Sequence, residues 1–232
     1  MVNKNEFLKY SATTSFERVV AFITSDNQSE DDIIKRYNDN IKVSQALYPE
    51  LSVLEITLRN AIDTMLKVQF GNNWLENEVK NNYLLDDYDY NTLISAYDKV
   101  KIECKKKSMN FSIGKVIANL SFGFWTNLCL KKYNAKIWTK KGTFKGVFPN
   151  YPKDRQQQIH AISLLLNSVR KLRNRVFHYE IILKEPEKLL KKYNEILELL
   201  SYLPQNNPKI LQETSNFLNV YNSIMMLEKA KT

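Results

Sequence analysis

The sequence has little glycine, proline, cysteine or histidine, and each shortage excludes a class of structure. Its 232 residues include five glycines and six prolines, too few for an all-β fold with many tight turns. It contains no run of about 18 apolar residues, so we expect no transmembrane helix. The first nine residues lack the apolar core of a signal peptide. We therefore expect a helical protein that stays out of the membrane and resides in the cytoplasm.

Only two cysteines occur, Cys104 and Cys129. They lie far apart in segments with helical spacing, and neither belongs to a CxxC pair or to a cluster with histidine. A structural zinc site needs about four cysteine or histidine ligands at short spacings. No metal and no cofactor are therefore predicted, and both cysteines are expected to be buried free thiols in a reducing compartment.

Positive charge is what the sequence has in excess. Lysine and arginine total 34 against 25 acidic residues, which gives a formal net charge of +9. Such a surplus favours a polyanionic partner, because phosphate contacts release counterions. Basic clusters occur at Lys105–Lys107, Lys131–Lys132, Lys140–Lys141 and Lys188–Lys192. Each cluster by itself is compatible with an ordinary solvated face.

Apolar residues recur with helical spacing along most of the chain. Ser29 followed by Glu30, Asp31 and Asp32 indicates a helix start, with a capping serine and negative charge at the positive end of the helix dipole. The next helix is predicted to carry Pro49 in its first turn and to end near Gly71. Further helices are predicted over 91–107, 111–130, 156–182, 186 to about 204, and 209–229. Segment 74–89 is predicted to be irregular, and segment 138–152, which contains Pro149, Pro152, Gly142 and Gly146, is predicted to be an exposed connection. The expected fold is an all-α bundle forming one domain over 1–232.

One of the two histidines, His178, lies in the strongest chemical signal of the chain, the segment Arg-Asn-Arg-Val-Phe-His. Because residues advance by about 100° along a helix, Arg170, Asn174 and His178 are predicted to share a face. Phe177 is predicted to pack beneath Arg173. Histidine exchanges protons near neutral pH, and arginine is a permanent cation suited to phosphate. The segment therefore points to phosphodiester chemistry, with a proton moved by the imidazole and charge stabilised by the guanidinium.

This spacing alone leaves three functions open. A histidine near a helix end is more often structural or simply exposed than catalytic. The chain can be an enzyme, a non-catalytic RNA-binding module, or an interaction protein that uses its helical surface. The other histidine, His160, stands alone in the sequence and is not predicted to be catalytic.

Three segments carry a resemblance to a known family. Leu54–Ile62 is similar to a helix with the pattern LE-x-x-LRNAI, and Leu120–Leu128 is similar to an LSFGFW segment. Leu172–Glu180 is similar to an LRNRVFHHE segment, with Tyr179 at the place of a second histidine, and contains the R-N-x-x-x-H form of the R-x4-6-H motif. With these segments in the family's order, the chain resembles the Abi-like (AbiD/AbiF-type) abortive-infection proteins of the HEPN superfamily.

The resemblance implies a fold and an activity that spacing does not show. It implies a HEPN-type helical bundle, with the helices of about 1–48 and 186–232 as additions. It also implies a metal-independent endoribonuclease of anti-phage defence or of a toxin system, in which the ribose 2′-hydroxyl attacks the adjacent phosphate. Arg173 and His178 are then the catalytic pair, and Asn174 their polar neighbour. The active site is expected where two copies of the motif meet in a homodimer, and an RNA or protein antitoxin is a further expected partner.

Six more residues are expected to bind RNA or to support the site: Arg170, Arg175, Tyr179, Glu55, Arg59 and Asn60. Glu55 and Arg59 are four residues apart and can pair on one helix face. They either buttress the site or form a plain surface pair worth a few tenths of a kcal/mol. Trp125, Phe122 and Phe124 are expected in the core or in a dimer contact rather than in a base-stacking platform. The segment 138–151, where aromatic residues lie near lysines, is expected to help hold RNA.

Overall fold

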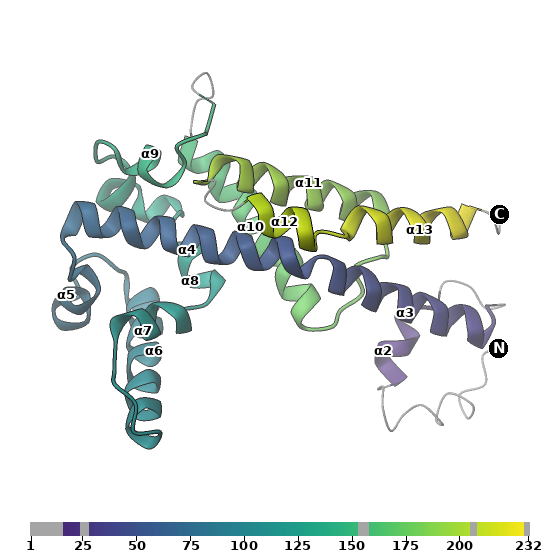
Figure 1. The fold of residues 1–232 in the computed structure, drawn as a ribbon, viewed down its shortest axis with the longest axis horizontal. Coiled ribbons are helices and arrows are strands. Elements are labelled where there is room, and N and C mark those ends of the chain that lie inside the picture. The colour runs from purple at the N-terminus through teal and green to yellow at the C-terminus, as the bar shows by residue number, and fades with distance from the viewer. Residues whose placement is uncertain (1–15, 24–27, 153–157, 205–207, 230–232) are drawn as a thin grey trace. The chain divides into compact units, whose positions relative to one another are not determined.

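A computed structural model describes residues 16–23, 28–152, 158–204 and 208–229 of the chain (Figure 1). These described residues form helices and no strands, so the all-α prediction is confirmed. The chain divides into two compact units. The first comprises residues 1–51, 171–194 and 207–232, and the second comprises 52–170 and 195–206. The organisation as one domain and the HEPN-type arrangement stay predictions, and any helix within residues 1–15 lies outside the described residues.

The first unit contains α2 (Phe16–Val20), α3 (Glu30–Ala46), α12 (Pro208–Thr214) and α13 (Phe217–Lys229), and α13 packs against α3 (Figure 1). It also contains the start of α4 (Tyr48–Phe70) and parts of α10 (Gln158–Phe177) and α11 (Pro186–Tyr202). The predicted caps are confirmed: the Ser29 hydroxyl accepts a hydrogen bond from the N–H of Asp32 at 3.2 Å. Pro49 lies in the first turn of α4.

A single last helix over 209–229 is wrong, because the chain leaves the helix at Ser215 and Asn216. The Ser215 hydroxyl donates to the carboxylate of Glu50, which is fully buried. Phe217 then begins α13 with its ring stacked on Tyr193, with 4.2 Å between the ring centroids. A tertiary hydrogen bond and a buried aromatic pair therefore decide this break.

The second unit contains most of α4, followed by α5 (Trp74–Asn81), α6 (Asp87–Lys106), α7 (Ile113–Asn119), α8 (Phe122–Asn127) and α9 (Thr143–Val147). Between α8 and α9 lie a 3₁₀ turn, η2 (Lys131–Tyr133), and a π-helical turn, η3 (Asn134–Trp138). Helix α4 ends at Phe70, and Gly71 follows with a φ of 92°. This left-handed conformation suits glycine and confirms the predicted helix end.

The prediction that 74–89 is irregular is wrong. Helix α5 buries Trp74 and Leu75, and the fully buried carboxylate of Glu78 accepts hydrogen bonds from the N–H groups of the next turn. The donors are Tyr83, Leu84 and Leu85, at 3.2, 3.0 and 2.8 Å. The sequence pattern hides this helix because its main organising side chain is an acid, which looks like a surface residue.

The predicted helix over 111–130 is two helices, because Leu120 adopts an extended ψ of 128°. Ser121 then caps α8 by accepting a hydrogen bond from the N–H of Phe124. The rings of Phe122, Phe124 and Trp125 are at most 2% exposed. Their assignment to the core is confirmed, and the break itself brings these three rings inward.

The prediction that 138–152 is an exposed connection is also wrong. Helix α9 occupies part of it, and Trp138, Phe148 and Tyr151 are buried. The side-chain amide of Asn150 donates to the carbonyl oxygen of Leu203 at 3.0 Å, and this bond holds the segment against the residue that follows α11. Its glycines and prolines suggested a loop, whereas its aromatic residues make it part of the core.

Both cysteines, Cys104 and Cys129, are free and buried, as predicted. Burial raises the pKa of the Cys129 thiol well above its ordinary value, so this sulfur is poorly suited to act as a nucleophile. Among the described helices, none combines the length and the apolar character that crossing a membrane requires.

Candidate functional site

The candidate site lies in the first unit, where α10 ends. The helix ends at Phe177 instead of reaching Ile182 as predicted. His178 is the next residue, and its backbone N–H donates to the carbonyl oxygen of Asn174 at 2.9 Å. Tyr179 then has a φ of 59° and turns the chain away from the helix. The histidine is thus the capping residue at the carboxyl end of α10, and its side chain is exposed.

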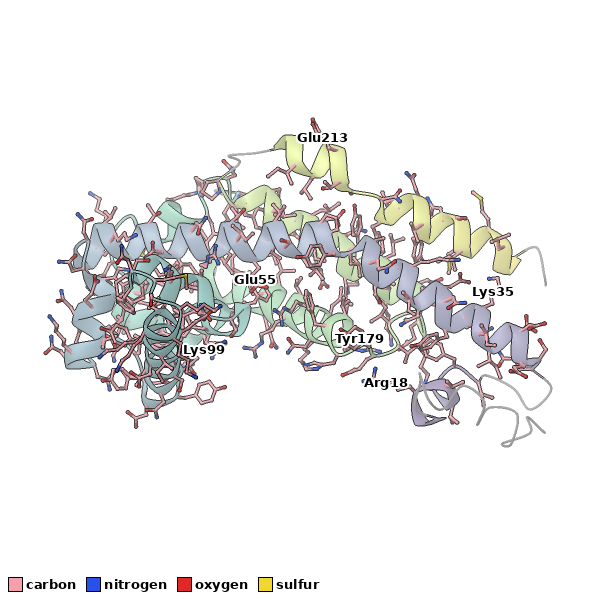
Figure 2. All side chains as sticks on the ribbon, turned by 60° about the horizontal axis from the view of Figure 1, so that its bottom comes forward. Arg18, Lys35, Glu55, Lys99, Tyr179 and Glu213 are labelled. Atoms are coloured by element: carbon pink, nitrogen blue, oxygen red, sulfur yellow. The ribbon has the colours of Figure 1, made fainter. Side chains whose placement is uncertain are left out.

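The turn after the helix is a Schellman motif with an unusual residue at its centre. The N–H of Tyr179 donates to the carbonyl oxygen of Val176 at 3.2 Å, and the N–H of Glu180 donates to that of Arg175 at 2.9 Å. Glycine normally occupies the left-handed position of this motif, because a side chain there is strained. The tyrosine ring is 74% exposed, and the guanidinium carbon of Arg18 lies 5.7 Å from its centroid (Figure 2).

Two polar side chains fasten this turn. Asn40 of α3 is 4% exposed, and its side-chain oxygen accepts hydrogen bonds from the N–H groups of Ile182 and Leu183 at 2.7 and 3.2 Å. Its amide nitrogen donates to the carbonyl oxygen of Glu180 at 3.2 Å. The Nε of Arg175 lies 3.4 Å from the Glu180 carboxylate. Arg175, predicted to bind RNA, therefore helps to hold the backbone that presents the histidine.

The side chains around the helix end form a mixed surface of cations and rings. The guanidinium carbon of Arg173 lies 4.3 Å from the centroid of the Phe177 ring, which confirms the predicted packing. That ring is 41% exposed and lies 6.2 Å from the ring of Tyr48, which is 57% exposed. Asn174 and His178 are exposed as well. Contact between the Asn174 amide and the imidazole stays a prediction, since the bond described above joins the two backbones.

This arrangement offers the groups that phosphodiester cleavage needs. An exposed imidazole can take a proton from a hydroxyl or give one to a leaving oxygen. A guanidinium held against an aromatic face keeps its charge and its orientation. Such a cation can stabilise the charge that develops on phosphoryl oxygens.

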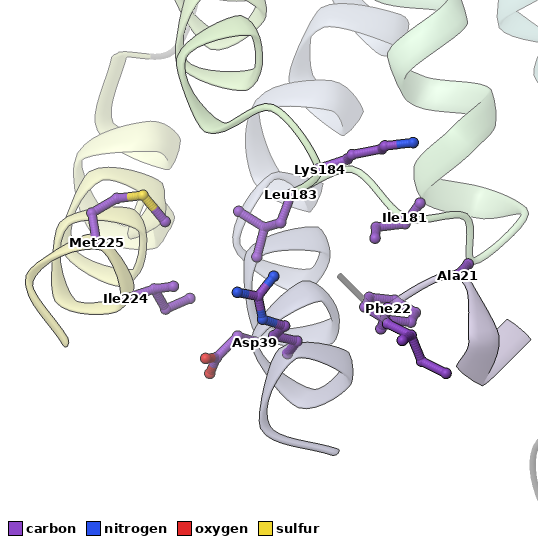
Figure 3. A pocket seen from close by; sticks show the side chains of 10 residues that line it. Ala21, Phe22, Asp39, Ile181, Leu183, Lys184, Ile224 and Met225 are labelled. Atoms are coloured by element: carbon purple, nitrogen blue, oxygen red, sulfur yellow. The ribbon is translucent and has the colours of Figure 1, made fainter. Parts of the chain in front are cut away.

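The first unit also contains a small pocket of about 120 Å³, next to the same turn (Figure 3). The side chains of Leu183, Ile224 and Met225 supply much of its apolar wall. Asp39 lines it too, but this carboxylate is held by Lys35, whose Nζ lies 2.7 Å away. Ligand pockets usually measure about 300–1,000 Å³, so this cavity is too small to take a nucleotide.

Arg170, predicted to share a face with Asn174 and His178, belongs to the second unit and has partners there. Its guanidinium donates to the side-chain oxygen of Asn127 at 2.7 Å and to that of Asn167 at 3.5 Å. The amide nitrogen of Asn127 in turn donates to a carboxylate oxygen of Asp89 at 2.8 Å. The arginine is therefore oriented by a chain of polar groups.

Asp89 is the centre of this chain and is fully buried. Its other carboxylate oxygen accepts hydrogen bonds from the Lys132 ammonium and from the Tyr133 hydroxyl, both at 2.7 Å. Lys132 also pairs with Asp86. We call this set the Asp89 network: Asp86, Asp89, Asn127, Lys132, Tyr133 and Arg170. Buried charges are tolerated only when they are paired in this way.

The network changes the acidity of its members. Although burial acts to raise the pKa of Asp86, hydrogen bonds from Lys132 and from the N–H of Asp89 outweigh it and hold the pKa at about 2. Burial raises the pKa of the Tyr133 hydroxyl, and its bond to Asp89 raises it further. The tyrosine therefore remains a hydrogen-bond donor. No spacing rule reveals this network, because its members come from three separate segments.

The remaining predicted residues lie on α4 in the second unit. The Nε of Arg59 donates to the side-chain oxygen of Asn60 at 3.3 Å, and Glu55 is partly buried. A Glu55–Arg59 pair and a supporting role for all three stay predictions. Among the residues that the structure describes, no group of three histidine, cysteine, aspartate or glutamate side chains could hold a metal ion.

Comparisons of the chain with models of protein families, with curated proteins and with solved structures find no match. The likeness to Abi-like and HEPN proteins is therefore carried by the three sequence segments alone.

Proposed function

We propose that the protein is a metal-independent endoribonuclease of the HEPN type that acts in anti-phage defence or as a toxin. The observation that carries this proposal is the grouping of the partly buried Arg173 with the exposed Asn174 and His178 at the carboxyl end of α10. The similarity of Leu172–Glu180 to an Abi-like segment and the net charge of +9 support it as well.

In the proposed reaction, the His178 imidazole takes the proton of a ribose 2′-hydroxyl. The resulting oxygen attacks the adjacent phosphorus, the bond to the 5′-oxygen breaks, and a proton is delivered to that leaving oxygen. The products are a 2′,3′-cyclic phosphate and a 5′-hydroxyl. Arg173 stabilises the negative charge on the phosphoryl oxygens, and Asn174 donates a hydrogen bond to the phosphate or to the imidazole.

A homodimer with a composite active site is part of the proposal. The reaction needs one group that accepts a proton and one that donates it, and the proposed site in one chain supplies a single imidazole. Two copies whose α10 ends face each other supply both. A toxic nuclease also needs restraint, for which an RNA or protein antitoxin is the proposed partner.

The test compares His178 with Asn194, an exposed residue of α11. Purified protein is incubated with RNA in the presence of a chelator, and cleavage is compared for the wild type, His178→Ala and Asn194→Ala. We expect cleavage by the wild type and by Asn194→Ala, and a rate reduced about 10²- to 10⁴-fold in His178→Ala. Equal rates for the two variants, or a wild type that cleaves no RNA, would overturn the proposal.

A second function, RNA binding without cleavage, is favoured by the surface formed by Arg173, Phe177 and Tyr48. Exposed rings beside a cation stack on unpaired bases in single-strand-binding proteins. This function predicts RNA binding that weakens with salt and leaves the RNA intact in the assay above.

A further inference from the structure

We propose that the second unit contains a separate binding site for a nucleoside monophosphate. The site is a pocket of about 510 Å³, which lies within the usual range of about 300–1,000 Å³ for ligand pockets. Six of its lining residues carry the argument: Lys131, Asn134, Trp138, Phe144, His160 and Ser163. They differ from the residues of the proposed nuclease site, so this inference does not rest on the nuclease proposal.

The aromatic side of the pocket is built and fixed by packing. The indole N–H of Trp138 donates to the carbonyl oxygen of Leu128 at 2.7 Å. The Phe144 ring lies 5.4 Å from the ring of Phe148 and meets that of Tyr151 edge-on at 5.3 Å. Rings held in this way do not have to be ordered when a ligand arrives. The partly exposed ring of Phe144 suits the flat face of a nucleobase, whereas the buried Trp138 mainly holds this side of the pocket in place.

The polar groups of the pocket suit an anion. None of the described residues that line it is acidic, and they include the ammonium of Lys131, the imidazole of His160 and the hydroxyl of Ser163. The adjacent Lys132 is held by Asp86 and Asp89. Lys131, by contrast, lies at the pocket and can make a charge-assisted hydrogen bond to a phosphate.

The local backbone is a second sign of a ligand site. The turn η3 is a π-helix over Asn134–Trp138, and both of its end residues line the pocket. Turns of this kind are rare, and those that interrupt α-helices occur frequently at functional sites. Here the turn places the exposed Asn134 amide on the cavity, which suits recognition of a base by a hydrogen-bonding group.

Calorimetric titration of the full chain tests the site with AMP, adenosine and a 5′-phosphorylated triadenylate. We expect AMP to bind about tenfold more tightly than adenosine, because one hydrogen bond between the phosphate and a charged group increases the affinity by about that factor. Tighter binding of the triadenylate than of AMP would identify a strand end as the natural source of the nucleotide. Failure of both phosphorylated probes to bind at millimolar concentration would overturn the proposal.

Two variants with matched controls complete the test. Lys131→Met should remove the difference between AMP and adenosine, whereas Lys106→Met, which removes the same charge at the exposed end of α6, should keep it. Ser163→Trp should fill the pocket and abolish binding of both probes while the circular dichroism spectrum stays unchanged. If Ser163→Trp does not fold, the comparison of Lys131→Met with Lys106→Met is sufficient to test the proposal. Equal weakening of AMP binding by these two substitutions would contradict a phosphate site at Lys131.

Discussion

Two regions of the molecule place arginines beside polar partners and do so in opposite ways. In the Asp89 network, Arg170 is held by Asn127, and the carboxylate at the centre is fully buried with hydrogen bonds to both oxygens. At the end of α10, Arg173 lies on a partly exposed ring, and the neighbouring Asn174 and His178 side chains are exposed. The first arrangement holds the fold, and the second leaves polar groups accessible to a ligand.

The difference follows from the cost of burying charge. A carboxylate removed from water must regain its lost interactions from fixed partners, and losing one of them leaves an uncompensated charge. A histidine at an exposed helix end has no such requirement. Substitutions in the Asp89 network should therefore reduce stability, whereas substitutions at the end of α10 should reduce activity at nearly unchanged stability.

The largest expected effect is on catalysis. Arg173→Ala should reduce the rate of RNA cleavage about 10²- to 10³-fold, as does removal of other groups that stabilise a developing negative charge. The matched control is Lys171→Ala, which removes one exposed positive charge from the same helix and should change the rate little. Single-turnover cleavage and thermal unfolding check both variants, and equal losses in the two would show that general charge, not this guanidinium, matters.

The second effect is on stability. Asp89→Ala should lower the free energy of unfolding by about 3 kcal/mol, because it leaves Lys132, Tyr133 and Asn127 without their shared acceptor. Asp98→Ala, an exposed position on the same helix, should change it by less than about 0.5 kcal/mol. Urea denaturation measures both free energies of unfolding, and a small loss for Asp89→Ala would show that the Asp89 network does not stabilise the fold.

A smaller effect is expected at the turn that presents the histidine. Tyr179→Gly should raise the free energy of unfolding by about 0.5–1 kcal/mol, because glycine adopts a positive φ without strain. Tyr179→Ala is the control, since it keeps the strain and loses the contact with Arg18, and it should not stabilise. Thermal unfolding of the two variants separates backbone strain from the loss of the ring.

The smallest expected effect is on how the free energy of unfolding changes at acidic pH. Because the folded pKa of Asp86 is lowered to about 2 from 3.8, the stability that this group contributes is present above about pH 4 and is lost as the pH falls toward 2. Asp86→Asn keeps a capping side chain and removes the charge. It should cost less than about 1 kcal/mol at neutral pH and should flatten the stability profile between pH 4 and 2, which acid titration of unfolding measures.

The features of the fold that local chemistry determines were predictable from the sequence. Ser29 with its acidic neighbours and Gly71 each mark a helix boundary through a single residue's capping or backbone preference. The breaks at Ser121 and Ser215 were missed, because a hydroxyl inside an apolar segment gives no sign of which backbone or side-chain group it will bind. The end of α10 was missed because tyrosine, not glycine, occupies the left-handed position.

The same difference between local and long-range features holds for the functional sites. Its residues share one short segment, so spacing alone brought Arg173 and Phe177 together, and the structure confirms that contact. The Asp89 network and the pocket around Trp138 are assembled from segments far apart in the chain. No periodicity encodes such an assembly, and only the packed structure brings these residues together.

The central claim is that the groups at the end of α10 cut RNA through its own 2′-hydroxyl. The most direct measurement compares cleavage of a random-sequence pool of oligoribonucleotides with that of the same pool carrying 2′-O-methyl groups throughout, both in chelator. The account predicts cleavage of the first pool to 2′,3′-cyclic phosphate ends and none of the second. Equal cleavage of the two pools would contradict it.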